Sequence, residues 1–291
     1  SCHMKGRLGN QLFIYAALRN IGIIKNYKIN YSKNLIHHGQ KCLLDYYNLY
    51  PSNVINSSCI THTYHQKKVA GPLNKEGGSC YYDANILNIP DNCKIHGHFI
   101  NEKYFYENRE IIKDELRVKE PTNILCQNYL DNIKSNKYTI IGIHFRRGDA
   151  VRETGEEGSF NEQTSINFVE KALSVISSKE NNIKLLCFIG GCRGNKAANP
   201  SVIKNTHDDD ITWLKDILQS KFNKYDAIIS PGTIENNVLT DYCLLSICDY
   251  NIIPNVSTFS WMAAYVNKKN DNKVYVNKDD CLSPAEKFIT L

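Results

Sequence analysis

The sequence predicts an α/β protein whose second half contains a doubly wound parallel sheet. Three observations indicate this fold. Short apolar segments alternate with amphipathic helical segments from residue 138 to residue 276. The connections between these segments are short, and the segment "YTIIGIHF" is β-branched and almost wholly apolar, as expected of a strand covered on both faces. Repeated β-α-β units of this kind form a parallel sheet that binds ligands at the carboxyl ends of its strands.

The elements of this half follow in a regular order. Strands are expected at residues 138–145, 184–191, 225–230, 250–254 and 272–276, with the last of these as the final strand. Helices are expected at 164–178, 211–222, 236–249 and 259–268. The first of these helices carries an apolar stripe made of Ile166, Val169, Ala172, Leu173 and Ile176.

The first half has a weaker pattern. A glycine-rich turn precedes a helix at 10–26, and a long polar segment continues to about residue 90. A strand at 94–99 and a helix at 101–118 follow, and a further helix comes after the proline-containing segment 119–123. We therefore predict two domains, residues 1–125 and 126–291.

Composition excludes several classes of protein. With 42% hydrophobic residues the chain is not disordered, and its charges are interspersed at a net charge of +5, so no nucleic-acid partner is expected. It has no apolar run of membrane-spanning length and no signal-peptide pattern. We expect a chain that is soluble as given, from the cytoplasm or, if an upstream anchor was removed, from the Golgi lumen. The sequence does not indicate an oligomeric state.

The eleven cysteines contain no CxxC pair, which argues against zinc ribbons and thioredoxin-like sites. Cys187, Cys243 and Cys248 lie in apolar segments and are expected to be buried free thiols. Four histidines, His37, His38, His62 and His65, lack partners at ligand spacing and are expected at the surface.

The motif "GRLGNQLF" (residues 6–13) places two glycines at the start of the first helix. Backbone N–H groups there can approach an anion. The alternative is a tight turn in which Asn10 is the helix N-cap.

The motif "TIIGIHFRRGDA" (residues 139–150) ends a predicted strand with charged side chains. Alternation along the strand separates His144 and Arg146 from Phe145 and Arg147. We expect Arg146 to reach a ligand, because a guanidinium makes bidentate bonds to a diphosphate. Arg147 is expected to have a structural role and to brace the loop, with Asp149 as its partner. The alternatives are a surface ion pair or an integrin-type RGD loop, which the fusion to a buried strand disfavours.

Two further motifs each have two interpretations. In "NVSTFSW", Ser257 and Thr258 either cap a helix or donate to a phosphate. In "THDDDITWL", three aspartates either form a metal site or, as we expect, Asp209 or Asp210 caps the helix that follows.

Together these residues make the chain resemble the α-1,2-fucosyltransferase family, which includes blood-group H and secretor-type enzymes. The resemblance lies in "GRLGNQLFIYA", "GHFINEKYF", "IGIHFRRGD" and "NVSTFSWMAAYV", which occur in the family's order. It implies the GT-B architecture of two Rossmann-like domains facing across a cleft. It also implies GDP-L-fucose as donor, a galactose-terminated glycan as acceptor, inversion at the anomeric carbon and no metal or other cofactor. In this chain the strand that normally precedes the glycine loop is missing or reduced to "SCHMK".

The resemblance also assigns residues. Arg146 matches the arginine that holds the donor β-phosphate, and His144 and Asp241 match positions that recognise guanine. Ser257, Thr258 and Phe259 match the second diphosphate contact and the wall beside the base. Gly9 and Asn10 match the pair that faces the sugar from the other domain. Asp149 and Glu153 are the nearest candidates for the catalytic base. The alternative functions are protein O-fucosyl transfer and non-catalytic binding of a GDP-sugar or glycan.

Overall fold

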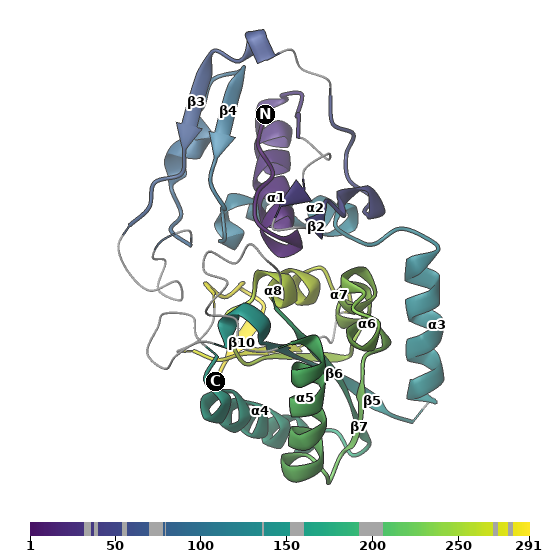
Figure 1. The fold of residues 1–291 in the computed structure, drawn as a ribbon. Coiled ribbons are helices and arrows are strands. Elements are labelled where there is room, and N and C mark those ends of the chain that lie inside the picture. Colours follow the sequence, from purple (N-terminus) through teal and green to yellow (C-terminus); the bar gives the residue numbers. More distant parts are fainter. Residues whose placement is uncertain are drawn as a thin grey trace. The chain divides into compact units, whose positions relative to one another are not determined.

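The structure is a computed structural model (Figure 1). It describes residues 1–31, 36–37, 40–53, 57–69, 78, 80–135, 137–151, 160–191, 206–269, 273–278 and 282–291. The chain divides into two compact units. The first contains Ser1–Lys119 and Leu282–Glu286, and the second contains Glu120–Cys281 and Lys287–Leu291. The boundary expected after residue 125 falls inside a helix of the second unit.

The first unit has a long helix, α1, beside short strands. Its helices are α1 (Leu8–Lys25) and α2 (Arg109–Glu115), and its strands are β1 (Ile36–His37), β2 (Gln40–Lys41), β3 (His62–His65) and β4 (Cys93–His96). β3 and β4 pair in parallel, and Cys2 forms parallel bridges to Tyr31 and to Ile95 of β4. The segment "SCHMK" therefore contributes one bridging residue, Cys2, in front of the glycine loop.

The predicted helix at 101–118 is wrong in its first half. Two 3-10 turns, Glu102–Tyr104 and Tyr106–Asn108, precede α2. Tyr104 and Phe105 are both buried in this interrupted segment. Phe105 has φ −144°, outside the helical region, so it separates the two turns.

The second unit contains one six-stranded sheet with the order β10-β9-β8-β5-β6-β7, in which all neighbours are parallel. Its strands are β5 (Thr139–Arg146), β6 (Ile183–Gly190), β7 (Asp226–Ile229), β8 (Tyr250–Ile253), β9 (Lys273–Val276) and β10 (Phe288–Thr290). The prediction that the chain's last strand lies at 272–276 is wrong, because β10 follows and pairs with β9. This extra strand covers an edge that would otherwise expose unpaired backbone groups.

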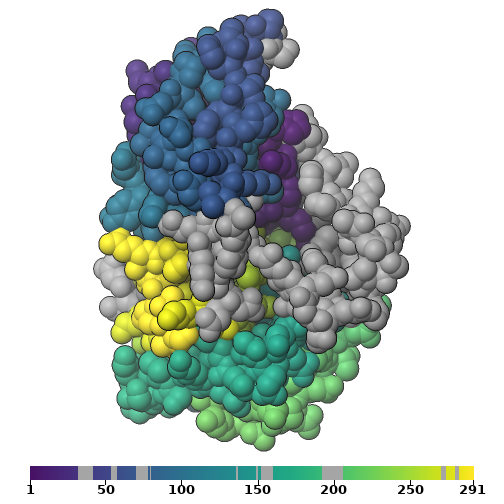
Figure 2. Space-filling model, turned by 90° about the vertical axis from the view of Figure 1, so that its left-hand side faces the viewer, coloured from purple at the N-terminus to yellow at the C-terminus, as the bar shows by residue number. Residues whose placement is uncertain are grey.

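Helices cover both faces of this sheet (Figure 1). They are α3 (Thr122–Lys134), α4 (Glu162–Ser177), α5 (His207–Lys221), α6 (Pro231–Ile234), α7 (Val238–Leu245) and α8 (Thr258–Tyr265). α4 and α5 lie on one face, and α7 and α8 lie on the other. The doubly wound arrangement is the predicted one. In Figure 2, α4 (teal) covers the visible face of this unit between the yellow C-terminal residues and the green segment that includes α5.

The apolar stripe predicted on α4 is buried along its whole length. It packs in a core cluster with Ile141, Ile143 and Phe145 of β5. Gly142, between these residues, faces the other side of the sheet, where an added Cβ would lie 2.9 Å from atoms of Leu245 and Cys248. The even-numbered residues of β5 therefore point toward α7 and α8, and this alternation sets the direction of His144 and Arg146.

Further expectations concern the burial of cysteines, the exposure of histidines and the absence of membrane-spanning helices. Cys187, Cys243 and Cys248 are buried free thiols, and His62 and His65 are exposed, as predicted. Among the described residues, no helix has the length and apolar character needed to cross a membrane.

The last ten residues contribute to both units. In the first, Glu286 donates its backbone N–H to Glu102 Oε2 at 2.7 Å. In the second, Lys287 Nζ donates to the carbonyl of Ala264 at 3.0 Å, and β10 completes the sheet.

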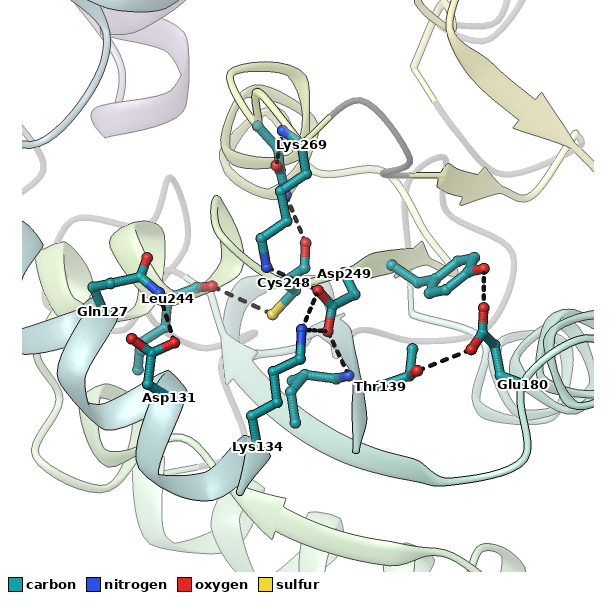
Figure 3. Close-up of polar contacts among 12 residues, drawn as sticks. Gln127, Asp131, Lys134, Thr139, Glu180, Leu244, Cys248, Asp249 and Lys269 are labelled. Atoms are coloured by element: carbon teal, nitrogen blue, oxygen red, sulfur yellow. Dashed lines mark hydrogen bonds and ion pairs between the residues drawn. The ribbon is translucent and has the colours of Figure 1, made fainter. Parts of the chain in front are cut away.

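The amino ends of β5 and β8 are joined by Asp249 (Figure 3). Its carboxylate accepts from the backbone N–H of Ile140 at 2.9 Å and from Lys134 Nζ and Lys269 Nζ, each at 2.9 Å. Burial alone would raise the pKa of Asp249, but the Ile140 N–H and the two ammonium groups hold it below its ordinary value. This cluster ties α3 and the segment after α8 to the amino edge of the sheet.

We expect Asp249→Ala to lower the free energy of unfolding by about 1.5–3 kcal/mol, because it removes a charged acceptor that binds three donor groups. Asp226→Ala is the matched control. Its carboxylate binds Lys184 at 3.0 Å but is 46% exposed, so we expect a loss below about 1 kcal/mol. Urea unfolding measures both. Equal losses in the two variants would contradict a special role for Asp249.

Candidate functional site

Arg146 ends β5 and is held against the loop between β8 and α8. Its backbone N–H donates to Asn255 Oδ1 at 3.3 Å, and Asn255 Nδ2 donates back to the Arg146 carbonyl at 3.0 Å. The guanidinium donates through Nη1 to the carbonyl of Val256 at 3.1 Å. Asn255 is 4% exposed, so a buried side chain makes both of these hydrogen bonds with the Arg146 backbone. These bonds fix the half-buried Arg146 beside the start of α8.

Helix α8 begins directly after this loop. Ser257 is its N-cap, and the hydroxyl accepts from the backbone N–H of Ser260 at 3.3 Å. Thr258 is the first helical residue. The predicted cap function of Ser257 is therefore present. The positive end of the helix dipole and the Arg146 guanidinium lie at the same edge of the sheet, which makes this edge suitable for an anion.

His144 lies two residues before Arg146 and points to the same face. Its ring centroid is 5.3 Å from that of Phe259, and Phe259 in turn lies 5.8 Å from Tyr242. Burial, and then the nearby charge of Arg146, lower the pKa of His144 to about 3, so the imidazole is neutral. Its buried Nδ1 has no hydrogen-bond partner within the described part of the chain. A buried polar atom of this kind is suited to a ligand.

Asp241 lies in the first turn of α7 and is almost completely buried. Its two oxygens accept from Ser230 Oγ at 2.6 Å and from Thr233 Oγ1 at 2.8 Å. Thr233 Oγ1 also accepts the backbone N–H of Ile189, near the carboxyl end of β6, at 3.2 Å. The carboxylate thus joins α6 and α7 to the same sheet edge. Burial raises the pKa of Asp241 to about 7, although both hydroxyls oppose the change.

The raised pKa of Asp241 predicts a pH-dependent stability. The folded state binds the proton more tightly than the unfolded chain, so this contribution is complete below the unfolded pKa of 3.8 and is lost as pH rises through about 7. Wild type should lose about 2–3 kcal/mol from this group between pH 5 and pH 8.5. Asp241→Asn removes the titration, so its stability relative to wild type should increase over that range in urea unfolding, whereas Asp208→Asn on α5 should show no such trend. A pH-independent difference for Asp241→Asn would contradict the raised pKa.

Arg147 points to the opposite side from Arg146. Its Nε donates to Asp210 Oδ1 of α5 at 2.8 Å, and Nη1 lies 3.9 Å from Glu162. The guanidinium also stacks over Trp213 at 4.2 Å and Phe160 at 4.9 Å. The described carboxylate partners are thus Asp210 and, at the longer distance, Glu162, whereas the expected partner Asp149 has a side chain outside the described residues. Of the two candidate bases, the side chain of Asp149 and all of Glu153 lie outside the described residues.

The expectation that Asp209 or Asp210 caps α5 is wrong. Thr206 is the N-cap, and it forms a capping box in which Asp209 accepts the Thr206 backbone N–H at 2.7 Å. Asp210 instead turns into the protein, because it is 0% exposed. Among the described residues, no group of three His, Cys, Asp or Glu side chains is arranged to hold a metal ion.

Gly9 and Asn10 belong to the first unit. α1 starts at Leu8, and Arg7 is its N-cap, so the alternative that Asn10 is the cap is wrong. The preceding Gly6 has φ +73°, and an added Cβ there would lie 2.4 Å from Asn10 Nδ2. Gln11 closes the turn by donating to the Gly6 carbonyl at 3.0 Å. The turn requires glycine at position 6.

Sequence reasoning missed Asn255, Asp210 and Gly191. Asn255 is a polar residue at a strand-to-helix junction, but its residue type alone does not indicate that it binds the backbone of Arg146. The pairing of Arg147 with Asp210 joins residues far apart in the sequence, and no local pattern indicates it.

Comparisons with known proteins identify a family and similar folds. A model of glycosyl transferase family 11 matches residues 80–287. The fold is similar to fucosyltransferase NodZ from Bradyrhizobium, with 12% identity over 90% of this chain and 92% of that chain and a TM-score of 0.50. It is also similar to an α-1,6-fucosyltransferase NodZ soaked with GDP-fucose (12% identity, 91% and 91%, TM-score 0.50). POFUT1 in complex with GDP is similar at 11% identity over 94% and 97% of the two chains, with a TM-score of 0.52.

No curated protein matches the chain in sequence. The structural similarities establish the fold, which is GT-B-like as predicted.

Proposed function

The chain belongs to glycosyl transferase family 11, a family of fucosyltransferases, and from this we propose that it transfers L-fucose from GDP-fucose to the 2-hydroxyl of a terminal galactose. The reaction inverts the anomeric configuration. The observation that carries the proposal is the fixed position of Arg146 beside the N-terminus of α8. The similar structures that contain GDP or GDP-fucose support a nucleotide-sugar donor.

The site is suited to stabilise a departing diphosphate. As the bond from fucose to GDP breaks, negative charge grows on the β-phosphate while the sugar becomes oxocarbenium-like. Arg146 and the N-terminus of α8, with Ser257 and Thr258, are donors fixed before the reaction begins, and they oppose this charge without reorganising. The proposal requires no metal and no other cofactor.

The nucleoside is proposed to lie near His144. The unpartnered Nδ1 of the neutral His144 imidazole can form a hydrogen bond with a polar edge of guanine. The ring of Phe259 lies beside the imidazole, where it can pack against the base. Asp241 is proposed to act on the same nucleoside. Both of its oxygens already accept hydroxyl hydrogen bonds, so we expect it to act on the nucleoside mainly by positioning α6 and α7 at this edge.

The remaining roles concern the acceptor and the sugar. Inversion requires the acceptor hydroxyl to attack from the face opposite GDP, with a base to take its proton. Asp149 and Glu153 are the proposed candidates for that base. Gly9 and Asn10, in the first unit, are proposed to face the sugar.

The test is an incubation with GDP-fucose and a pair of matched acceptors. A β-galactoside and its 6-deoxy analogue should both be fucosylated, and the 2-deoxy analogue should not react. The product should carry an α-linked fucose by NMR. Transfer to the 2-deoxy but not the 6-deoxy acceptor would overturn the 2-hydroxyl assignment, and transfer only to a folded protein domain would favour protein O-fucosylation. GDP-fucose binding without transfer to any acceptor would favour a binding module.

A further inference from the structure

We propose that Asp210 is a positioning residue for the leaving-group arginine: by pairing with Arg147 inside the protein, it holds the turn that carries Arg146. The inference rests on the proposed function, because it concerns the same donor site. It also gives a role to the three-aspartate motif, residues 208–210. Asp210 of this motif is not the helix N-cap, and the described residues of the motif do not form a metal site.

The three aspartates have different surroundings. Asp208 is exposed, and Asp209 is exposed and completes the capping box with Thr206. Asp210 is fully buried, and its Oδ1 accepts from Arg147 Nε at 2.8 Å. A buried carboxylate needs a charged partner, and a buried guanidinium needs the same. Each side chain therefore fixes the other.

Aromatic rings restrict the guanidinium further. Trp213, one turn after Asp210 on α5, and Phe160, just before α4, both lie within cation-π distance of Arg147. The planar group is therefore held by a charge and by two rings. This leaves Arg147 little rotational freedom, which is what a brace requires.

The backbone of Arg147 is held as firmly as its side chain. Its N–H donates to the carbonyl of Gly190 at 2.7 Å, and its carbonyl accepts from the N–H of Ala150 at 3.2 Å. A Cβ on Gly191 would lie 1.9 Å from the Arg147 carbonyl oxygen, so the ends of β5 and β6 are in direct backbone contact. Gly148, with φ +62°, then turns the chain away.

Arg146 and Arg147 share a peptide bond, so a movement of one moves the other. Asn255 holds this peptide from the α8 side, and Asp210 holds it from the α5 side. In a variant in which Asp210 carries no charge, the hydrogen bonds from Asn255 keep their strength and the ion pair with Arg147 is lost. A displacement of about 1 Å at a reacting group can reduce a rate by about 100-fold.

The first experiment compares Asp210→Asn with Asp208→Asn as the matched control on the same helical turn. We expect kcat for fucosyl transfer to fall about 10- to 100-fold in Asp210→Asn, with KM for the acceptor nearly unchanged. GDP affinity, measured by calorimetry, should fall with it. Asp208→Asn should stay within twofold of wild type in both. A folded Asp210→Asn with wild-type kcat and GDP affinity would overturn the proposal.

A second variant separates positioning from stability. Arg147→Met combined with Asp210→Leu removes both charges, and such replacements of buried pairs preserve or raise stability. We expect a melting temperature close to that of wild type but a kcat as low as that of Asp210→Asn. Recovery of kcat together with stability would show that the pair only maintains the fold, and would overturn the proposal. This variant also serves if Asp210→Asn fails to fold.

A double-mutant cycle with Arg146→Lys tests the route of the effect. If Asp210 acts through Arg146, Asp210→Asn should reduce kcat much less in the Arg146→Lys background than in wild type. Full multiplication of the two losses would contradict this route. If wild type transfers no fucose to any acceptor, the proposed function fails, whereas an active wild type with an additive cycle rejects only the role of Asp210.

Discussion

Arg146→Ala is expected to reduce kcat/KM for fucosyl transfer by about 100- to 1000-fold. The loss corresponds to roughly 3–4 kcal/mol of transition-state stabilisation, the size of effect seen when one fixed donor to a developing anion is removed. Most of the change should appear in kcat, because charge on the β-phosphate grows mainly as the bond breaks. Steady-state kinetics with GDP-fucose and a β-galactoside measure it.

Two controls accompany Arg146→Ala. Arg146→Lys keeps the charge but loses the planar fork, so we expect an intermediate loss. Arg109→Ala removes a surface arginine of the first unit, which stacks on Tyr106, and should leave kinetics unchanged. Because Arg146 is only half-buried, the melting temperature of Arg146→Ala should change little. Activity of Arg146→Ala within threefold of wild type would mean that the leaving-group site lies elsewhere.

Gly191→Ala is expected to destabilise the protein by about 3 kcal/mol or more, a fall in melting temperature of roughly 6–12 °C. The added methyl group would meet the Arg147 carbonyl oxygen at 1.9 Å and the Gly148 Cα at 2.9 Å. Both are backbone atoms, so no side-chain rotation can relieve the overlap. The turn after Arg146 would also move. We therefore expect fucosyl transfer by the variant to fall by more than its unfolded fraction accounts for.

Gly190→Ala is the matched control, one residue earlier. A Cβ there would lie 3.8 Å from His144 Nε2, which is an ordinary contact. We expect a change in stability below about 1 kcal/mol. Thermal unfolding of both variants measures the contrast. Equal behaviour of the two variants would contradict the close approach of the β5 and β6 ends.

The sequence predicts the sheet of the second unit because its signals are local. The apolar core of β5 and the periodic stripe from Ile166 to Ile176 need only neighbouring residues to be recognised. The family resemblance is confirmed at the level of glycosyl transferase family 11, with a GT-B-like fold. The finer assignment to galactose 2-hydroxyl transfer stays a proposal.

Other features depend on contacts between distant residues, and the sequence could not supply them. β10 is three residues long, and only its pairing with β9 makes it a strand. The predicted helix at 101–118 is interrupted at Phe105, whose φ of −144° lies outside the helical region, and no Gly or Pro in that segment indicates the break. The ion pair between Arg147 and Asp210 of α5 joins residues 63 positions apart, and it forms because that helix packs on the same face of the sheet.

The last ten residues are divided between the two units, so proteolysis near the C-terminus would affect both units. Removing residues 282–291 would remove the edge strand β10 from one unit and, from the other, the Glu286 backbone N–H that donates to Glu102. The freshly exposed edge would be β9, with the apolar sequence "VYV", and bare edges of this kind template aggregation. The C-terminal segment 282–291 therefore protects both units. Trimming it would make the protein prone to aggregation or degradation, although every residue of the donor site in β5 and α8 would still be present.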